Sequence, residues 1–306
     1  MEFTLSEEVA SALAEHRPVV ALESTIIAHG FPAPDNLAVG QALEAAVRSR
    51  GGVPATIAIL DGIIRVGLDD DALARVAEGP CEKCSVRDLA VVSAAGGDGA
   101  TTVAATLVIA ARAGIGVFAT GGIGGVHRGA ERSFDISADL TELSRTPGAV
   151  VCAGAKSILD LPATLEMLET LGVPVLGYRV DTFPAFHARS SGLPLKHRID
   201  DVAAMAATIK AHRTFGLPGA VLVCNPPPAS AALGSDALEA LVTAAQAEAT
   251  AAGITGPALT PYLLAALDRL SAGKTRIVNR ALAIANAELG ADLAGQLAKE
   301  TGPDAS

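Results

Sequence analysis

The stretch "PVVALESTIIAHGFPAPDNLAVGQALEAAVRSRG", residues 18–51, contains the unit from which the fold is predicted. It opens with a short run of apolar, mostly β-branched residues and then passes through a polar segment. The following "DNLAVGQALEAAVRSRG" is rich in alanine and leucine, as expected for a helix. Asp35 and Gly51 suit the N-cap and C-cap of that helix. A strand followed by a helix is the building block of α/β proteins.

The same alternation recurs along the chain. Further strand-like runs are "GVFAT", "AVVCAG", "PVLGY" and "AVLVC", starting at residues 116, 149, 174 and 220, with helical stretches between several of them. This rhythm predicts a largely parallel sheet with helices on both faces, that is, a three-layer α/β/α fold. Asp61-Gly62 lies between two apolar runs in "ATIAILDGIIRVG", which predicts a hairpin and makes the sheet mixed.

The last third of the chain, residues 235–298, predicts one helix after another. No low-complexity linker or repeat divides the sequence. We therefore expect a single domain over residues 1–306, with a helical C-terminal region and a frayed tail after about residue 299.

Composition excludes several classes of protein. The chain has 306 residues, half of them apolar, and a formal net charge of -10, which argues against a nonspecific grip on nucleic acid. Apolar runs stop short of the roughly 20 residues that span a bilayer, and the N-terminus is acidic. Four cysteines make no disulfide framework here, and the C-x-x-C at Cys81 and Cys84 has no second pair at zinc spacing. We expect no membrane insertion, a structural role for that motif, and a cytoplasmic location.

A glycine-rich loop follows the run "GVFAT". Residues 120–125 read "TGGIGG", and such small residues let the backbone approach a ligand closely. The dinucleotide fingerprint G-x-G-x-x-G fails, because a pattern started at Gly122 has His127 at its third glycine position. A nicotinamide or flavin cofactor is therefore not expected.

A charged run comes directly after these glycines and contains two aspartates four residues apart. Asp135 and Asp139 could both face one hard cation, or one could bind a cation and the other a ligand. Alternatively, Ser137 or Asp139 caps the helix that begins at "DLTEL". The residue pattern leaves both possibilities open.

Three further residues with reactive or charged side chains are candidates for chemistry. Glu23 ends the first strand and is either a structural cap or an acid/base, while Lys83 is either functional or paired with Glu82 or Asp88. Only six of the 23 basic residues are lysines, and one of them, Lys156, follows the strand "AVVCAG". Unlike arginine, lysine can act as a neutral amine that attacks an aldehyde-level carbon. An ion pair at the sheet edge is the alternative for it.

Seven segments, in order and spacing, resemble one known family. They are "VALESTIIAHG", "PATIAILDGIIRVGL", "KCSVRDL", "GATTVAATLVIAA", "FATGGIGGVHRGAERSFDISADL", "VVCAGAKSILDL" and "TPYLL". The chain resembles the pseudouridine-5'-phosphate glycosidase family, also called the indigoidine synthase A-like family, from about residue 18 to residue 294. The strings "TGGIGGVHRG" and "CAGAKSILD" are long and unusual, which makes the resemblance specific.

This resemblance implies an enzyme that reversibly cleaves the C-C glycosidic bond of pseudouridine 5'-phosphate to uracil and ribose 5-phosphate. It also implies a divalent metal, Mn²⁺, and a homotrimer. Carried over by position, Lys156 is the nucleophile, Glu23 the proton donor and Asp135 the metal ligand. The implied substrate contacts are Lys83, Val103, Ser137, Ala138, Asp139 and Asn279, and His127 is a further candidate for holding the phosphate.

The sequence departs from the family in two places. "NRALAIANA" keeps Asn279 and Asn286 of the family's C-terminal pattern but differs at Arg280 and Ala285, and "KCSVRDL" differs at two positions while keeping Lys83 in register. Two other activities use part of this residue set. A Schiff-base aldolase or lyase acting on another sugar phosphate needs the same lysine but no base-binding part, and a non-catalytic sugar-phosphate-binding protein needs neither Lys156 nor Glu23.

Overall fold

The opening strand and helix form as predicted in the computed structural model, which describes residues 3–299. Strand β2 (Val19–Leu22) is buried along its whole length, and after the short α2 (Thr25–His29) comes α3 (Asp35–Ser49). Asp35 is the first helical residue and Pro34 is the cap, so the helix begins one residue before the predicted start. Gly51 follows the helix with φ of 77°, the left-handed conformation typical of a helix C-terminus.

The strands form one mixed sheet within residues 3–299. Its order is β1-β4-β3-β2-β7-β8-β11-β9-β10, and β6, which pairs with β5, is joined to β3. All pairs are parallel except β3 with β4 and β3 with β6. The remaining strands are β1 (Phe3–Leu5), β3 (Val53–Leu60), β4 (Ile63–Val66), β5 (Glu82–Cys84), β6 (Gly99–Thr101), β7 (Val117–Ala119), β8 (Gly148–Cys152), β9 (Val175–Tyr178), β10 (His197–Ile199) and β11 (Ala220–Cys224).

The predicted hairpin joins β3 and β4. Asp61 and Gly62 both have positive φ, 54° and 75°, as a two-residue turn between antiparallel strands needs. A Cβ on Gly62 would lie 2.4 Å from the carbonyl oxygen of Ser93, so the turn accepts only glycine there. This turn makes the sheet mixed, as predicted.

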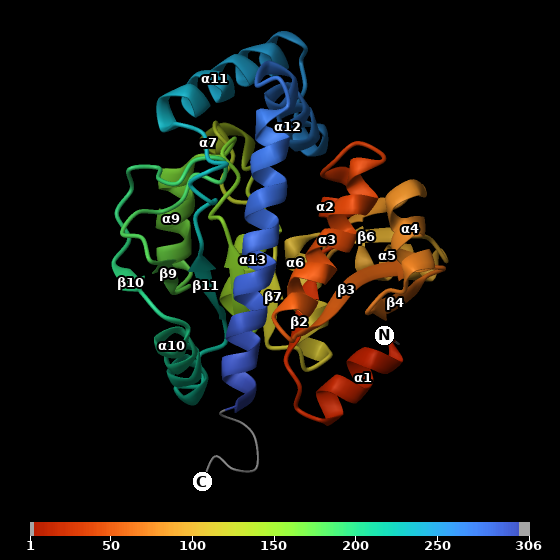
Figure 1. The fold of residues 1–306 in the computed structure, drawn as a ribbon. Helices are drawn as coiled ribbons and strands as arrows, with labels where there is room; N and C mark the ends of the chain where they lie inside the picture. Colours follow the sequence, from red (N-terminus) through yellow and green to blue (C-terminus); the bar gives the residue numbers. More distant parts are fainter. Residues whose placement is uncertain (1–2, 300–306) are drawn as a thin grey trace.

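Helices cover both faces of the sheet, which confirms the three-layer fold (Figure 1). Alternate residues of a strand enter different cores: in β8, Val150 and Cys152 join one cluster, and Ala149 and Val151 join the other. The first cluster packs under α1 (Glu7–Ala14), α5 (Leu89–Ala94), α6 (Val103–Arg112), α8 (Ala138–Arg145) and α9 (Leu161–Thr170). The second packs under α2, α3, α4 (Asp70–Glu78), α10 (Val202–Thr214) and α13 (Lys274–Lys299).

The C-terminal region is helical, as predicted. It comprises α11 (Ser235–Ala251), a 3-10 turn at Gly256–Ala258, α12 (Leu259–Leu270) and α13. Helix α13 crosses the sheet between α3 and α10, and Gly290 permits this contact because its Cβ would lie 3.1 Å from that of Ala119. The tail after residue 299, predicted to fray, lies outside the described residues.

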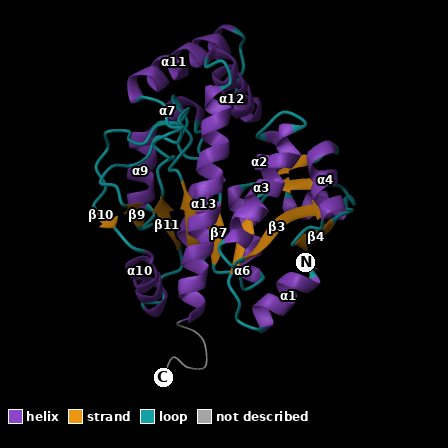
Figure 2. Ribbon diagram, in the orientation of Figure 1, coloured by secondary structure: helices purple, strands orange, loops and turns teal. Residues whose placement is uncertain are grey.

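Loops gather at one end of the sheet, beneath α11 and α12 (Figure 2). They include the segment around the short α7 (Ala130–Ser133). Open α/β sheets bind their ligands beyond the carboxyl ends of the strands. Within residues 3–299, no helix combines the length and the hydropathy needed to cross a bilayer.

Candidate active site

The glycine-rich loop runs beside the segment that bears Lys156. After β7 and β8 end, four backbone hydrogen bonds continue the ladder between the two segments. They run from Thr120 N to Val151 O (3.0 Å), Ala153 N to Gly121 O (2.9 Å), Ile123 N to Gly154 O (3.1 Å) and Lys156 N to Ile123 O (3.1 Å). Lys156 is therefore held by the loop at the exit of β8, where the sequence predicts it.

The small residues before Lys156 have a packing reason. Gly154 has φ of 80°, and a Cβ there would lie 2.3 Å from the carbonyl oxygen of Pro184. Ala153 and Ala155 are completely buried, whereas Lys156 is only half-buried. The amine of Lys156 therefore extends from a segment whose backbone is tightly packed.

Glu23 lies at the carboxyl end of β2 and is 6% exposed. The hydroxyls of Thr25 and Thr120 each donate a hydrogen bond to one of its carboxylate oxygens. Ser24, and not Glu23, is the N-cap of α2, so the structural-cap alternative is wrong for this helix. Because β2, β7 and β8 are neighbours in the sheet, Glu23, the glycine-rich loop and Lys156 come from three adjacent strand ends.

Lys83, in β5, faces the same group of charges. Loss of water around its amine and the positive charge of Lys156 lower the pKa of Lys83, while the carboxylates of Asp139, Glu23 and Asp135 act in the opposite direction. Within residues 3–299, no ion pair shorter than 4 Å joins Lys83 to a carboxylate, so the predicted pairing with Glu82 or Asp88 does not occur. We call this group of five charged residues the charged cluster.

Asp139 links two elements of the site. Its carboxylate accepts hydrogen bonds from the backbone amides of Ala104 (2.9 Å) in α6 and Gly124 (2.7 Å) in the loop. Ser137 is the N-cap of α8, which confirms the capping alternative, and Ala138, the first helical residue, is exposed. A Cβ on Gly124 would lie 2.3 Å from Ser137 Oγ, so this glycine is needed for close packing inside the protein.

Other glycines of the loop also approach side chains of the protein. A Cβ on Gly122 would lie 2.6 Å from Phe186, and one on Gly125 would lie 2.5 Å from Thr164. The predicted close approach of backbone to ligand is therefore, at these positions, a close approach to neighbouring segments.

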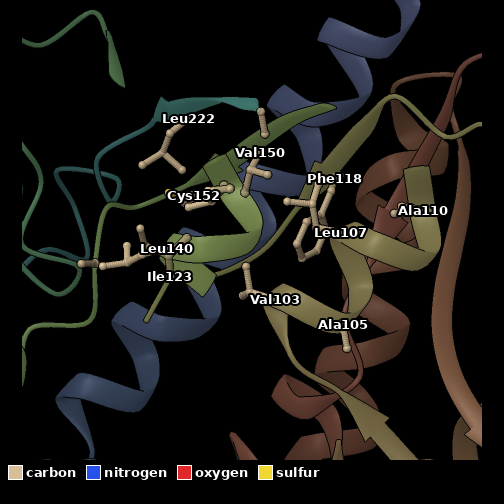
Figure 3. Close-up of a cluster of buried hydrophobic side chains, with 14 of the residues drawn as sticks. Val103, Ala105, Leu107, Ala110, Phe118, Ile123, Leu140, Val150, Cys152 and Leu222 are labelled. Carbon is tan, nitrogen blue, oxygen red and sulfur yellow. The ribbon is translucent and has the colours of Figure 1, made fainter. Parts of the chain in front are cut away.

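Val103 can reach a ligand only through its backbone. Its side chain is 3% exposed and packs in the core between α6 and the sheet (Figure 3). Thr102 is the N-cap of α6, and Val103 is the first helical residue. Its amide belongs to the first turn, where N–H groups have no acceptor within the helix and favour an anion.

His127 and Asp135 lie side by side. His127 Nδ1 is 3.9 Å from Asp135 Oδ2, and its Nε2 is 3.4 Å from the hydroxyl of Thr260 in α12. Burial lowers the pKa of His127, and the charges of Lys156 and Lys83 lower it further against the opposing effect of Asp135. Arg128 points elsewhere and forms a two-bond ion pair with Glu239 of α11.

Asp135 can hold a metal only with help from ligands other than acidic and histidine side chains. Within residues 3–299, no group of three or more His, Cys, Asp or Glu side chains is arranged to hold an ion. The carboxylate of Asp135 is about one-third exposed. Mg²⁺ and Mn²⁺ accept one or two carboxylates and complete their shells with water and substrate oxygens, so a partly exposed aspartate fits such an ion.

A cavity of about 350 Å³ is lined in part by Asn279, which lies against Gly121 of the glycine-rich loop, and by His29, which senses the charge of Lys83. Its walls come from α2, α12, α13 and the segment around His187. Asn279 lines it, and Asn279 Oδ1 is buried without a hydrogen-bond partner among the described residues. His29 also lines it, and burial together with the charge of Lys83 lowers the pKa of His29. A ligand in the cluster could therefore extend into this cavity.

The sequence reasoning missed His29 and His187. His29 lies within the quoted segment after β2, so its position near a strand end could have indicated it. His187 has no such signal, because its partner Ser157 is 30 residues away; the Nδ1–Oγ distance is 2.9 Å.

His187 predicts a dependence of stability on pH. Burial lowers its pKa to about 3, whereas an unfolded histidine titrates near 6.5. Between these values only the unfolded chain binds the proton, so the free energy of unfolding falls as the pH drops below about 6.5. From pH 7 to pH 5.5 this group accounts for a loss of about 1.2 kcal/mol. Urea unfolding should show that His187→Asn removes this part of the loss and that His197→Gln, at an exposed site, does not; equal losses in all three proteins would contradict it.

Both cysteines of the C-x-x-C motif are buried. Burial raises the pKa of the Cys81 thiol to about 11 and that of Cys84 to about 12. Thiols of this kind are poor nucleophiles and poor metal ligands. All four cysteines are free and buried.

Comparison with known proteins identifies a family and individual relatives that are similar to this chain. Residues 8–296 match the family described as "Indigoidine synthase A like protein". A protein of Paracoccus denitrificans named pseudouridine-5'-phosphate glycosidase is 54% identical over 96% of this chain and 98% of its own length. One of the same name from Chloroflexus aurantiacus is 52% identical over 96% and 98%.

Two solved structures have the same fold. The prealnumycin C-glycosynthase in complex with ribulose 5-phosphate has a TM-score of 0.91 and 43% identity, with 98% of each chain covered. An indigoidine synthase A-like protein from Thermotoga maritima has a TM-score of 0.89 and 34% identity, with 97% of each chain covered. On the extent of these matches, the chain belongs to the indigoidine synthase A-like family.

Proposed function

We propose that the protein cleaves the C-C glycosidic bond of pseudouridine 5'-phosphate to give uracil and ribose 5-phosphate. The observation that carries this proposal is the arrangement of Lys156, Glu23 and Lys83 at one end of the sheet. An amine and an acid at the ends of the two strands that flank β7, with a second cation nearby, suit a phosphorylated sugar. The names of the relatives and the pentose phosphate bound to the C-glycosynthase support the same substrate class.

The substrate spans the charged cluster and the adjoining cavity. Lys83, Ser137 and the amides of Val103 and Ala138 hold the phosphorylated sugar, with His127 as a further hydrogen-bonding group. Asp139 orients the α6 N-terminus and the glycine-rich loop beside it. Asn279 meets the base, because its unpartnered Oδ1 can accept a hydrogen bond from a uracil N–H.

The reaction begins with opening of the sugar ring. A carbon-linked base is a poor leaving group, because the carbon at the bond has no lone pair to protonate. Glu23 donates a proton to the ribose ring oxygen while the uracil ring pushes electrons toward C1', and the C1'–O bond breaks. Lys156 Nζ then adds to the electrophilic C1', and the electrons return to the uracil ring.

The carbon-carbon bond breaks in the second half of the reaction. A proton is added at uracil C5, the nitrogen lone pair of Lys156 forms a C=N bond, and the C1'–C5 electron pair remains with uracil. Water then hydrolyses the iminium and releases ribose 5-phosphate and the free amine. Nitrogen is needed because it both attacks and stabilises the carbon left behind. Each step is reversible, so uracil and ribose 5-phosphate should recombine when both are supplied in excess.

Asp135 would hold the divalent metal, Mn²⁺, with water and substrate oxygens completing its shell. When bound, such an ion neutralises negative charge and orients a phosphorylated ligand. His127, beside Asp135, keeps this loop packed against Thr260.

Replacing Asp135 by alanine tests the metal assignment. We expect Asp135→Ala to lose Mn²⁺ on dialysis and at least about tenfold of its activity, since a principal charged ligand is gone. Metal content is measured by mass spectrometry and activity by uracil release. Asp236→Ala, an exposed acid on α11, is the control and should keep both. Unchanged metal content in Asp135→Ala would show that the ion binds elsewhere.

We also expect a homotrimer. Phe134, next to Asp135, is 82% exposed, and Phe215 is 80% exposed, so both side chains are available for contact with another subunit. Light scattering after size exclusion should give three times the subunit mass of 30.7 kDa. A species with the mass of one subunit at micromolar concentration would contradict the expectation.

The activity itself is tested by incubating the protein with pseudouridine 5'-phosphate and Mn²⁺ and separating the products by chromatography. The proposal predicts uracil and ribose 5-phosphate in equal amounts. A Schiff-base aldolase or lyase would consume another sugar phosphate and release no uracil. A non-catalytic binding protein would retain the nucleotide unchanged.

A further inference from the structure

A buried asparagine links the segments that carry the acid and the amine. Asn286 lies in α13, is completely buried, and makes three hydrogen bonds through its side-chain amide. Its Nδ2 donates to the carbonyl oxygens of Thr120 (2.8 Å) and Gly121 (3.3 Å), and its Oδ1 accepts from Asn225 Nδ2 (3.1 Å). Leu282, Ala283 and Ala287, its neighbours on this helix, are apolar. These hydrogen bonds offset the free-energy cost of burying a polar amide among apolar side chains.

The orientation of this amide follows from its partners. Carbonyl oxygens only accept hydrogen bonds, so the NH₂ group of Asn286 must face Thr120 and Gly121. Its oxygen therefore faces Asn225, whose backbone amide in turn donates to Cys152 O (2.8 Å) at the end of β8. The chain of bonds thus runs from helix α13 to two strand ends of the site.

Each of the two carbonyls belongs to a residue that positions a reacting group. The hydroxyl of Thr120 donates to Glu23, and the carbonyl of Gly121 also accepts from Ala153 N, three residues before Lys156. A shift of the loop backbone at these two residues would move the partner of the acid and the support of the amine together.

We infer that Asn286 is a positioning residue, which fixes the glycine-rich loop so that Glu23 and Lys156 keep their relative placement. The inference rests on the proposed function, because it requires these two groups to act in one reaction. Other residue types fail for physical reasons. Leucine would leave the carbonyls without this donor, and aspartate would place a carboxylate oxygen against them.

The test is a double-mutant cycle measured on the full-length protein. Asn286→Ala should lower kcat for uracil release by about tenfold to hundredfold and change KM by less than about threefold, since misplacement affects the reaction more than binding. Thr120→Val removes the hydroxyl that bonds Glu23. If Asn286 acts through Thr120, the two effects overlap. The fold decrease in kcat of the double variant should then be at least about threefold smaller than the product of the two single fold decreases.

Asn36→Ala is the matched control. Asn36 is also buried, and its Nδ2 donates a hydrogen bond to a backbone carbonyl. The acceptor is Ala77 O of α4, at 2.7 Å. This variant should lose thermal stability as Asn286→Ala does, with kcat within about threefold of wild type. When Asn36→Ala is combined with Thr120→Val, the fold change in kcat should equal the product of the two single fold changes.

The outcomes separate the two proposals. Multiplicative losses for Asn286→Ala and Thr120→Val, or a kcat within about threefold of wild type in Asn286→Ala, would overturn the inference. If Asn286→Ala does not fold, Asn225→Ala decides, because it removes the donor to Asn286 Oδ1 and leaves the side chain held by the two carbonyls alone; it should lower kcat at least about threefold, and an unchanged kcat would overturn the inference. A wild-type protein without uracil release would instead refute the proposed function.

Discussion

Substitution of Lys156 by alanine is expected to abolish uracil release, with kcat lowered at least about a thousandfold. The amine is the only group proposed to bond covalently to C1', and the small residues around it leave no substitute. Its side chain is half-buried, so the variant should fold, which a thermal unfolding curve can verify. Uracil release by Lys156→Ala above about one-tenth of the wild-type rate would rule out the covalent role.

Two further variants separate nucleophile from charge. Lys156→Arg keeps a positive charge but offers no neutral amine, so it should be as inactive as Lys156→Ala. If Lys156 only attracts the phosphate, arginine would restore most of the activity. Lys196→Ala, at an exposed site, is the matched control and should behave as wild type.

The second large effect is expected at Glu23. Glu23→Gln should lower kcat by about a hundredfold to ten-thousandfold, the range of a general acid, because an amide cannot release a proton to the ring oxygen. The shape of the side chain is preserved, and Thr25 and Thr120 can still hydrogen bond to it. KM for pseudouridine 5'-phosphate should therefore change little.

Glu44→Gln is the control for this variant. Glu44 is half-buried and also accepts a hydrogen bond from a threonine hydroxyl, Thr56 Oγ1 at 2.6 Å, but it lies on α3 away from the charged cluster. Both variants should show similar changes in stability, and only Glu23→Gln should lose activity. Similar kinetics for the two would remove Glu23 from the mechanism.

The fold could be predicted because its signals are local. Apolar, strand-like runs that alternate with helical stretches and the Asp61-Gly62 turn are visible in short windows of sequence, and both appear in the structure. The order of the strands was not predicted. It depends on which strands pair across long separations, as β2 does with β7.

The site could be predicted where residues follow a strand end. Glu23 and Lys156 are of this kind, and the structure places them after β2 and β8, the two strands on either side of β7. Hydrogen bonds between residues that are far apart in the sequence could not be predicted in this way. Asp139 bonds an amide 35 residues earlier, and Asn286 bonds a carbonyl 166 residues earlier. Such roles depend on the packed structure, in which α8 and α13 meet the glycine-rich loop.

The most direct test of the mechanism is to trap its covalent intermediate. The protein is incubated with pseudouridine 5'-phosphate and Mn²⁺, reduced with borohydride, digested and analysed by mass spectrometry. Reduction of the iminium should leave one pentose phosphate attached to the peptide that contains Lys156, and no adduct in Lys156→Ala. Uracil release without any adduct, or an adduct on another lysine, would contradict the account.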